Sequence, residues 1–382
     1  MTGRPDCTIR HPASKIRLMT DFMPIKGWDH LELYVGNAKQ AAYFYENALG
    51  FTPTAYAGPE TGMRDRASYV LDQNDIRLIL TSGLRPDSEI TRFACSHGDG
   101  VKDVALAVPS ATEAYRQAVQ RGARSVVEPH WVEDDYGRVE LATIATYGEN
   151  VHTFVDRNDY AGPYLPGYRS LTENGEQAAG IGLQNIDHVV GNVELGRMQH
   201  WVEFYERAFG MTELIHFSDE AISTEYSALM SKVMMDGEGK IKFPINEPAE
   251  GKRKSQIEEY LDFYGGPGVQ HVAMATDDIV GTVEELEGRG LSFLKTPTAY
   301  YDDLEDRVGE IDADYDDLRR LGILADRDEE GYLLQIFTKT AQDRPTLFFE
   351  VIERHGSRGF GEGNFKALFE AIEREQALRG NL

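Results

Sequence analysis

Three residues in the C-terminal half of the chain are of types that could together bind a metal ion. His188 begins an apolar strand pattern, and His271 lies in the strand-like segment GVQHVAMAT. Glu350 lies in TLFFEVIERHG, where strand alternation places it on one face with Phe348 and Ile352. A carboxylate on such an apolar face is costly unless it is paired or binds a metal. The three side chains therefore form a candidate metal site.

The chemistry of such a site depends on the positions that the protein leaves open. Two imidazoles and one carboxylate, each carried by a strand, correspond to the two-histidine, one-carboxylate set that holds non-haem iron(II). This set fills three corners of an octahedron, so a bidentate organic ligand and O₂ can bind at the other three. We therefore expect iron(II), bound by His188, His271 and Glu350, as the cofactor.

Each of the three residues also has an ordinary structural interpretation. A single histidine in a strand is more often a hydrogen-bonded residue than a metal ligand, and Glu350 could instead pair with Arg354. The three together favour the metal site. The remaining histidines keep the structural interpretation, apart from His30, which is discussed below: His11, His97, His130, His152, His200, His216 and His355.

The elements that carry these residues belong to a unit that is repeated along the chain. GWDHLELYVGNAKQAAYFYENALGFTPTAY, from Gly27, matches NIDHVVGNVELGRMQHWVEFYERAFGMTELIH, from Asn185, in a strand carrying Asp-His and a helix pattern closed by glycine. A second pair of segments, from Gly100 and Gly268, each reads as a strand, a helix, a turn and another strand. Each half therefore contains the same supersecondary unit twice.

Strand-like segments separate these repeated stretches. Residues 224–234 and 240–245 flank the turn DGEG, which favours a hairpin, and residues 326–338 form a similar pattern with its turn at Glu330-Gly331. A stretch rich in Gly, Pro and polar residues follows the first half and is typical of a linker. We expect a disordered tail (1–21), an N-terminal domain (22–160), a linker (161–181) and a catalytic C-terminal domain (182–382) with a helix at 364–378.

The first half provides an internal comparison for the metal site. The positions that match His188, His271 and Glu350 are His30, Asp103 and Thr153, and only the first of these could still act as a ligand. We therefore predict that the first domain is a degenerate, metal-free copy. The chain should bind one iron(II), in its second domain.

Composition and charge exclude several classes of protein. Asp and Glu number 64 against 39 Lys and Arg, a formal charge of −25, which disfavours nucleic-acid and membrane-surface partners. The two cysteines, Cys7 and Cys95, allow neither a disulfide framework nor a thiolate zinc site. No apolar run is long enough for a membrane span, and the first residues lack the pattern of a signal peptide. We expect a soluble cytoplasmic protein.

The repeated unit of one strand, one helix and three strands resembles the module of the vicinal oxygen chelate superfamily. That superfamily includes glyoxalase, extradiol dioxygenases and bleomycin-resistance proteins. The resemblance implies an α+β fold of two tandem domains, each made of two βαβββ modules that form a half-open barrel, with the C-terminal helix as a lid.

The second half also resembles the 4-hydroxyphenylpyruvate dioxygenase family. The motifs are IDHVVGNVELGRM, TEYSALMSKV, GYLLQIFTK, DRPTLFFEVIERHG and GFGEGNFKALFEAIEREQALRGNL, and the first half fits more loosely. The resemblance places the family's iron ligands on His188, His271 and Glu350. It implies that 4-hydroxyphenylpyruvate and O₂ become homogentisate and CO₂ in tyrosine catabolism, by oxidative decarboxylation, ring hydroxylation and side-chain migration. It further implies a homo-oligomer, a dimer or tetramer formed through the first domain.

The family's substrate pocket falls on a set of neutral polar residues and two aromatic rings. The polar positions are Ser231, Asn246, Gln256, Gln270 and Gln335, of which Asn246, Gln256 and Gln270 are expected to act in catalysis. Phe337 and Phe365 match the rings that enclose the aromatic substrate. Neutral amides suit a phenolic hydroxyl because they can both donate and accept. Taken singly, each glutamine could be a surface amide and each phenylalanine a core residue.

The C-terminal segment carries an apolar stripe. Phe365, Leu368, Phe369 and Ile372 follow helical spacing, and the glycine-rich stretch Gly359–Gly363 precedes them. One interpretation is a helix that caps the barrel. The other is a lid, with the glycines as its hinge, that excludes water from the site.

Four other functions remain to be distinguished. 4-Hydroxymandelate synthase uses the same substrate and iron but tends to carry an aliphatic residue in place of Asn246. An extradiol dioxygenase would need a further histidine and tyrosine near the metal, and a glyoxalase would draw ligands from both domains. A binding module of the bleomycin-resistance type would need no metal set.

Overall fold

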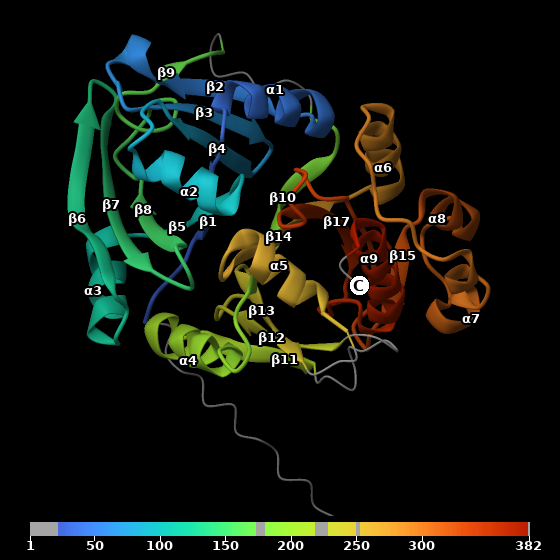
Figure 1. Ribbon diagram of the computed structural model, residues 1–382. Coiled ribbons are helices and arrows are strands. Elements are labelled where there is room, and N and C mark those ends of the chain that lie inside the picture. Colours follow the sequence, from blue (N-terminus) through green and yellow to red (C-terminus); the bar gives the residue numbers. More distant parts are fainter. Residues whose placement is uncertain (1–21, 173–179, 218–227, 250–252, 381–382) are drawn as a thin grey trace, which may run out of the picture.

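Two β-sheets dominate the computed structural model, which describes residues 22–172, 180–217, 228–249 and 253–380. Figure 1 shows the first sheet at the left and top and the second at the centre and lower right. The first sheet contains β1 (Gly27–Tyr34), β2 (Thr52–Ala57), β3 (Arg66–Gln73), β4 (Ile76–Gly83), β5 (Gly100–Ala107), β6 (Ser125–Asp134), β7 (Gly137–Ala145), β8 (Val151–Asp156) and β9 (Arg169–Ser170). The second contains β10 (Leu183–Asn192), β11 (Thr212–Phe217), β12 (Ala228–Met235), β13 (Lys242–Ala249), β14 (Gly268–Thr276), β15 (Leu324–Arg327), β16 (Tyr332–Phe337) and β17 (Phe348–His355).

The helices lie between the strands and at the C-terminal end. They are α1 (Ala38–Leu49), α2 (Glu89–His97), α3 (Ala111–Gln120), α4 (Met198–Phe209), α5 (Gln256–Tyr264), α6 (Ile279–Gly288), α7 (Leu304–Val308), α8 (Tyr315–Leu321) and α9 (Phe365–Arg379). Short 3₁₀ turns are η1 (Pro59–Thr61), η3 (Thr298–Tyr301) and η4 (Glu362–Asn364). The tail expected at residues 1–21 lies outside the described residues.

Strand order confirms the fourfold repeat. The first sheet has the order β6-β7-β8-β5-β1-β4-β3-β2-β9, and the second has the order β11-β12-β13-β10-β14-β17-β16-β15. In all four modules the first strand therefore lies next to the last one, and a helix follows the first strand. The two modules of each half meet through an antiparallel pair, β1 with β5 and β10 with β14. This is the predicted arrangement of βαβββ modules in two half-open barrels.

Local sequence signals explain several element boundaries. Helices α1 and α4 end at Gly50 and Gly210, whose φ values of 72° and 73° are in the left-handed region that favours glycine. The DGEG turn joins β12 to β13 in the expected antiparallel hairpin, and β15 pairs with β16 across the turn at Glu330-Gly331. The part of the first predicted hairpin at 224–227 lies outside the described residues.

The prediction of one helix per module was incomplete. Helices α2 and α5 connect the two modules of each half, and α7 and α8 lie in an insertion before β15. These helices have nine residues or fewer, so their periodicity is too short to stand out from the surrounding loops. Within the predicted linker 161–181, β9 pairs with β2. The domain boundaries themselves stay a prediction.

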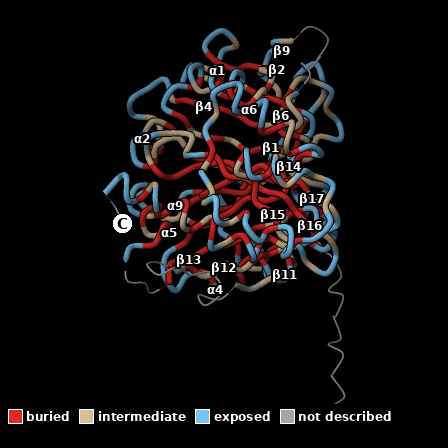
Figure 2. Tube along the Cα trace, turned by 90° about the vertical axis from the view of Figure 1, so that its right-hand side faces the viewer, coloured by how far each residue is buried: buried red, intermediate tan, exposed pale blue. Residues whose placement is uncertain are grey.

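The buried interior lies between the sheets and their helices, and Figure 2 shows it as a continuous red region. One large cluster of buried apolar side chains includes residues of both halves. In β10, Val189 belongs to this cluster, whereas His188 and Val190 point into a cavity. Strand alternation therefore gives the sheet an apolar face for the core and an opposite face for the site.

Candidate metal centre and adjoining cavity

Three neighbouring strands carry the candidate metal ligands. His188 lies on β10, His271 on β14 and Glu350 on β17, and β14 is the middle strand. Ala273 on β14 is paired with His188 on one side and with Glu350 on the other. His271 precedes Ala273 by two residues and therefore points to the same face. Strand register thus brings together side chains that lie far apart in the sequence.

The three side chains converge on one point. Nε2 of His188 lies 3.2 Å from Oε2 of Glu350, and Nε2 of His271 lies 3.4 Å from the same oxygen. All three residues are buried, and their candidate ligand atoms lie within 4.8 Å of one another. Ligands about 2.1 Å from a common metal ion and at right angles to one another would be roughly 3 Å apart. The spacing of the set therefore fits a metal ion.

Hydrogen bonds fix the orientation of both imidazoles. Nδ1 of His188 lies 2.6 Å from Oδ1 of Asp187, and Nδ1 of His271 lies 2.9 Å from Oε1 of Gln270. Because both partners are acceptors, the Nδ1 atoms carry the protons and the Nε2 atoms face Glu350. Electron-pair donors from three residues then point at one another, an arrangement that a bound cation between them would stabilise.

Burial and charge act in opposite directions on the ionisation of these groups. Burial would raise the pKa of Glu350, but the charge and hydrogen bond of His188 and the contact with His271 outweigh it and lower that pKa to about 2. Burial lowers the pKa of His271. For His188 burial acts the same way, but Glu350 and Asp187 outweigh it and raise the pKa. An ionised carboxylate beside a neutral imidazole is a suitable donor set for a divalent metal.

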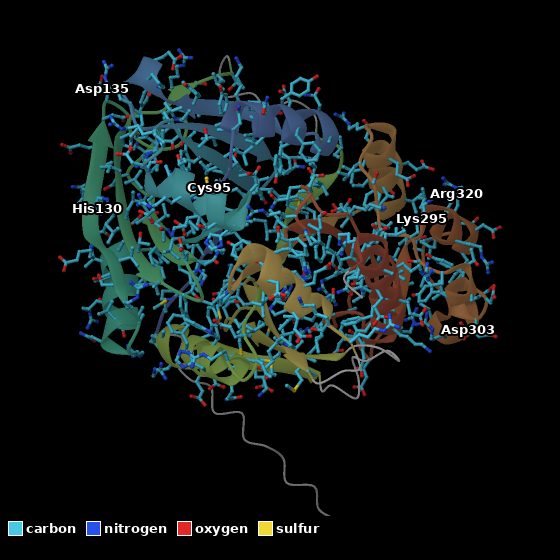
Figure 3. All side chains as sticks on the ribbon, viewed as in Figure 1. Cys95, His130, Asp135, Lys295, Asp303 and Arg320 are labelled. Atoms are coloured by element: carbon cyan, nitrogen blue, oxygen red, sulfur yellow. The ribbon has the colours of Figure 1, made fainter. Side chains whose placement is uncertain are left out.

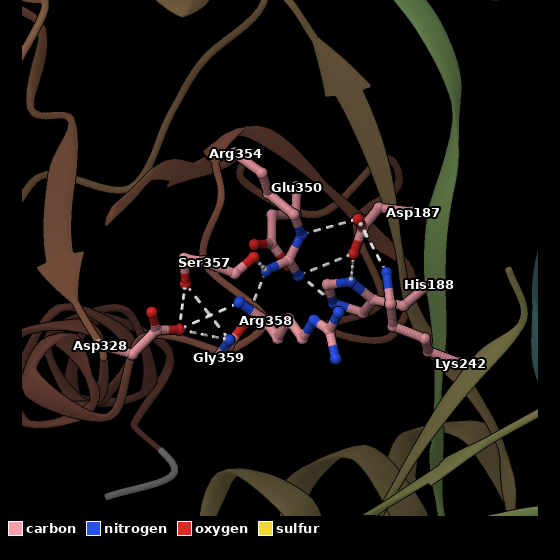
Figure 4. A network of polar contacts seen from close by, with 9 residues as sticks. All are labelled: Asp187, His188, Lys242, Asp328, Glu350, Arg354, Ser357, Arg358 and Gly359. Atoms are coloured by element: carbon pink, nitrogen blue, oxygen red, sulfur yellow. Dashed lines mark hydrogen bonds and ion pairs between the residues drawn. The ribbon is translucent and has the colours of Figure 1, made fainter. Parts of the chain in front are cut away.

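The alternative partner considered for Glu350 is bound elsewhere. Arg354 donates from Nε and Nη2 to the two oxygens of Asp187, at 2.8 and 2.9 Å. Asp187 also accepts from Nζ of Lys242 at 3.2 Å. Figure 4 shows Asp187 between these two cations and the ring of His188. The carboxylate of Glu350 therefore remains available to a metal ion.

A cavity with an empty volume of about 610 Å³ adjoins the three ligands. Its lining includes all the pocket residues expected from the sequence: Ser231, Asn246, Gln256, Gln270, Gln335, Phe337 and Phe365. It also includes the four residues of the predicted apolar stripe on α9. The mixed apolar and polar lining is typical of a site for one small organic molecule.

The amides around the cavity have different hydrogen-bonding capacities. Gln270 already accepts from His271 through Oε1, which leaves its amide nitrogen to other partners. Asn246 donates to Oδ1 of Asn192 at 3.4 Å, which leaves its own oxygen as an acceptor. Nε2 of Gln335 is buried and has no hydrogen-bond partner. A buried donor without a partner is costly, so a bound ligand would satisfy it.

Two predicted residues reach the cavity from hairpin and helix positions. Ser231 on β12 is paired directly with Asn246 on β13. Gln256 is the first residue of α5, whose start is fixed by a capping box between Ser255 and Glu258. The helix start therefore determines where the Gln256 side chain enters the cavity.

Aromatic rings surround the metal ligands. The ring of Phe348 stacks on His271 with centroids 4.8 Å apart, and Phe337 meets the same imidazole edge-on at 5.9 Å. Phe360 packs edge-on against His188 at 5.0 Å. The sequence analysis did not assign Phe360 to the site. The only local signal for it was its position inside the glycine-rich stretch before α9.

The sequence analysis also missed the carboxylate that supports His188. Its signal was the Asp-His dipeptide, which occurs at the same place in both halves, as Asp29-His30 and Asp187-His188. A carboxylate that accepts from Nδ1 of a metal-binding histidine orients the ring and makes it a better donor. The repeated dipeptide could therefore have identified Asp187.

The first half contains the equivalent positions in the same register. His30 is paired with Ala105, as His188 is with Ala273. Asp103 accepts hydrogen bonds from the backbone amide and the hydroxyl of Thr153. Nε2 of His30 lies 3.2 Å from the hydroxyl of Tyr164. The matching side chains thus bind one another and a tyrosine, and the absence of a metal from this domain stays a prediction.

Models of known protein families match both halves of the chain. Residues 19–165 match the N-terminal domain of hydroxyphenylpyruvate dioxygenase. Residues 185–336 match the glyoxalase, bleomycin-resistance protein and dioxygenase superfamily. Among the described residues, no helix combines the length and apolarity needed to cross a membrane.

Similar proteins extend over almost the whole chain. A 4-hydroxyphenylpyruvate dioxygenase from Aspergillus fumigatus is 47% identical over 99% of this chain and 99% of its own. One from Dictyostelium discoideum is 47% identical over 94% of this chain and 100% of its own. Among solved structures, a triple mutant of 4-hydroxymandelate synthase from Streptomyces coelicolor is 37% identical, with a TM-score of 0.83, over 93% of this chain and 100% of that one.

Proposed function

Because the chain belongs to the 4-hydroxyphenylpyruvate dioxygenase family, we propose that it holds one iron(II) between His188, His271 and Glu350. The protein is an enzyme that converts 4-hydroxyphenylpyruvate and O₂ to homogentisate and CO₂. The observation that carries the proposal is the convergence of three buried ligands on a cavity lined by neutral amides and aromatic rings. The supply of substrate from tyrosine, and the cytoplasm as the compartment, remain parts of the proposal.

Iron(II) bound by three protein side chains supplies open positions for a 2-oxo acid and O₂, and the redox chemistry of oxidative decarboxylation and hydroxylation. The role of the protein ligands is to hold the metal at the floor of the cavity. The hydrogen bonds from Nδ1 of His188 and His271 keep both Nε2 atoms directed at it. These contacts fix the ligand set before substrate arrives.

The neutral polar side chains orient the substrate. We assign recognition of the phenolic hydroxyl to the amides of Asn246, Gln256 and Gln270, with Ser231 and Gln335 completing the polar surface. Amides can donate to an oxygen that gains negative charge and accept from a hydroxyl, so they suit both substrate and product. Asn246, Gln256 and Gln270 are the proposed catalytic residues because they would contact the ring that is hydroxylated.

The charges of the described cavity lining agree with this assignment. Apart from the three ligands, the described lining contains no acidic, basic or histidine side chain. Among the described residues, recognition of the substrate carboxylate would therefore fall to the bound metal rather than to an arginine or lysine. Proton transfer would fall to the substrate and water, because the neutral amides can hydrogen-bond but do not titrate.

The aromatic and apolar side chains hold the ring and exclude water. Phe337 lies beside His271, and Phe365 enters the cavity from α9. We assign these two rings the role of enclosing the substrate. The apolar stripe of α9 covers the cavity and would keep bulk water from the reacting groups.

4-Hydroxymandelate synthase is the competing function, because a mutant of such an enzyme is the solved structure described above. It shares the substrate and the metal, so neither the fold nor the ligand set separates the two. Asn246 favours the dioxygenase, since the synthases tend to have an aliphatic residue at this position. The identity of the product decides between them.

The metal assignment has a direct test. Protein stripped with a chelator should regain 4-hydroxyphenylpyruvate-dependent O₂ uptake with Fe(II) and not with Zn(II). His271→Ala should bind less than one-tenth of a metal equivalent per chain, because a facial set cannot lose a ligand without losing affinity. His30→Ala, the equivalent change in the first half, should still bind one equivalent. Two metal ions per chain, or full activity of His271→Ala, would contradict the assignment.

We also propose a homo-oligomer, a dimer or tetramer, formed through the first domain. The edge strand β6 is exposed on both faces, and Val126, Val127 and Trp131 are exposed apolar residues on it. Figure 3 labels His130 and Asp135 along this outer edge of the molecule. Unpaired exposed strands are usually covered. Sedimentation should show a complex that Trp131→Glu weakens; a parent chain that sediments as a monomer would refute the proposal.

A further inference from the structure

Asp187 and Arg354 form a buried pair behind the metal ligands. The guanidinium donates two hydrogen bonds to the carboxylate, which also accepts from His188. Such a pair has an evident role in orienting His188. The other contacts of Arg354 indicate a second role.

The third nitrogen of Arg354 reaches the segment that leads to α9. Nη1 donates to the carbonyl oxygen of Gly359 at 2.7 Å. This carbonyl belongs to residues 356–361, which we call the closing segment. Phe360 lies in this segment, and its ring packs against His188. The guanidinium of Arg354 lies 5.3 Å from the centroid of the Phe360 ring. Arg354 therefore contacts both the support of a metal ligand and the closing segment.

The closing segment is held from its other side by Asp328. This carboxylate accepts from the backbone amides of Arg358 and Gly359, at 3.0 and 2.9 Å, and from the hydroxyl of Ser357. Figure 4 shows Arg354 and Asp328 on either side of the segment. Within the described part of the chain, Asp328 contacts neither Asp187 nor His188, so the two attachments can be separated by mutation.

The first half repeats the aspartate and arginine contacts of this arrangement. Asp29 accepts from Nδ1 of His30 and from two nitrogens of Arg157, at 2.6, 2.7 and 2.8 Å. Nη1 of Arg157 donates to the carbonyl oxygen of Tyr164, whose ring meets His30 edge-on at 5.4 Å. Arg157 follows Thr153 by four residues, just as Arg354 follows Glu350. In both halves, arginine thus fixes an aromatic residue over the histidine.

Because the first half keeps the aspartate–arginine pair without the full set of metal ligands, the pair has a role other than metal binding. The first half has Asp103 and Thr153 where the second has two ligands, yet it retains the aspartate, the arginine and the aromatic ring. The feature that both halves share is the fixed segment that covers the histidine after the last strand of the second module, β8 or β17.

We propose that Asp187 and Arg354 are positioning residues that attach the closing segment to the metal centre, so that the position of Phe360 and the start of α9 depends on the orientation of His188. The inference rests on the proposed iron site. It implies that metal binding and closure of the cavity are coupled through one arginine. In the first domain, Arg157 makes the equivalent structural attachment, between Asp29 and the segment that carries Tyr164.

Arg354→Lys is the variant that tests the proposal. Lysine keeps the positive charge beside Asp187 but cannot also reach Gly359 with a second nitrogen. We expect amide hydrogen exchange at residues 357–361 to become about tenfold faster, and affinity for Co(II), read from its absorption spectrum, to fall about 10-fold to 100-fold. In the Fe(II) enzyme, O₂ consumed per homogentisate should rise.

Two further variants make the result specific. Arg157→Lys should speed exchange around residue 164 and leave Co(II) affinity and O₂ coupling unchanged. Asp328→Asn should loosen the closing segment and uncouple O₂ use while Co(II) affinity stays near that of the parent. It also tests the segment's role if Arg354→Lys does not fold.

Two results would overturn the inference. One is unchanged exchange at 357–361 in Arg354→Lys. The other is an equal loss of Co(II) affinity in Arg157→Lys, which would indicate general destabilisation. Exchange and Co(II) binding do not depend on the product, whereas failure of the parent enzyme to form homogentisate would refute the proposed function instead.

Discussion

In the cavity, charged and neutral side chains have different proposed roles: the charged group binds the metal, and the neutral groups hydrogen-bond to the substrate. In the proposed metal site, the ionised carboxylate of Glu350 faces the Nε2 atoms of two imidazoles, and the surrounding amides carry no net charge. Burial makes any further fixed charge costly there. We therefore propose that selection between ring and side-chain hydroxylation comes from the shape and hydrogen bonds of neutral residues, and that Asn246 is one of them.

We predict that Asn246→Ile changes the product more than the binding of substrate. Isoleucine removes the amide that would orient the phenolic hydroxyl but leaves the metal ligands intact. Homogentisate formation should fall at least about tenfold. This factor corresponds to roughly 1.4 kcal/mol, the transition-state stabilisation lost with one hydrogen bond. Chromatography of the reaction mixture should also reveal a side-chain-hydroxylated product. Unchanged homogentisate turnover would show that Asn246 does not orient the ring.

Asp103 in the first half gives a pH-dependent prediction. Burial raises its pKa to about 6, despite the opposing charge of His30 and the hydrogen bonds from Thr153. A carboxyl whose pKa is higher in the folded state stabilises the fold only while protonated, so its contribution is present below about pH 4 and is lost as the pH rises through about 6.

Asp103→Asn should therefore be more stable than the parent at pH 8 and not at pH 4. The free energy of unfolding should rise by at most about 3 kcal/mol, the value that corresponds to the raised pKa of Asp103. The rise is expected because an amide keeps the hydrogen bonds without ionising. Denaturant unfolding at several pH values measures it. The exposed Asp135 provides the baseline for removing one charge, through Asp135→Asn. A difference between parent and Asp103→Asn that does not grow with pH would contradict the prediction.

At the scale of elements, α9 both lines the cavity and packs against α5. Its apolar stripe lines the cavity, and Arg379 near its end pairs with the buried Glu259 of α5 at 2.6 Å. The same α5 carries Gln256. The helix that covers the site is therefore attached to the helix that lines it.

Ending the chain after Asn364 should uncouple O₂ use from product formation. All three ligands and the closing segment precede this point, so the fold and one metal equivalent should persist. Water would then reach the reacting groups, and more than one O₂ should be consumed per homogentisate. Phe365→Ala should show part of this effect, while Leu378→Ala, on the exposed side of α9, should not. Tight coupling in the shortened chain would show that α9 is only a structural cap.

At the scale of the whole molecule, local patterns predicted much and distant contacts little. Strand alternation, the glycines at 50 and 210 and the stripe on α9 are local signals, and they located the modules and the C-terminal helix correctly. The candidate metal ligands could be proposed from the sequence because they are chemically distinctive and lie at matching places of the repeated modules. The Asp187–Arg354 pair spans 167 residues of sequence, so no local pattern could indicate it. The same applies to Phe360, whose place over His188 depends on the closing segment.

The duplicated architecture explains how one chain can carry two similar barrels with different tasks. Both halves keep the strand order and the aspartate–histidine–arginine contacts, so these features have a structural role in both halves. Only the second half combines them with His271, Glu350 and a cavity of neutral amides. The account therefore places the whole reaction in the second domain and predicts a specific product.

Product identification tests that account most directly. The Fe(II)-loaded protein is given limiting 4-hydroxyphenylpyruvate in the presence of O₂, and the products are separated and quantified. We predict homogentisate and CO₂ in equal amounts, with one O₂ consumed for each. 4-Hydroxymandelate as the main product would contradict the account, because the cavity would then direct hydroxylation to the side chain instead of the ring.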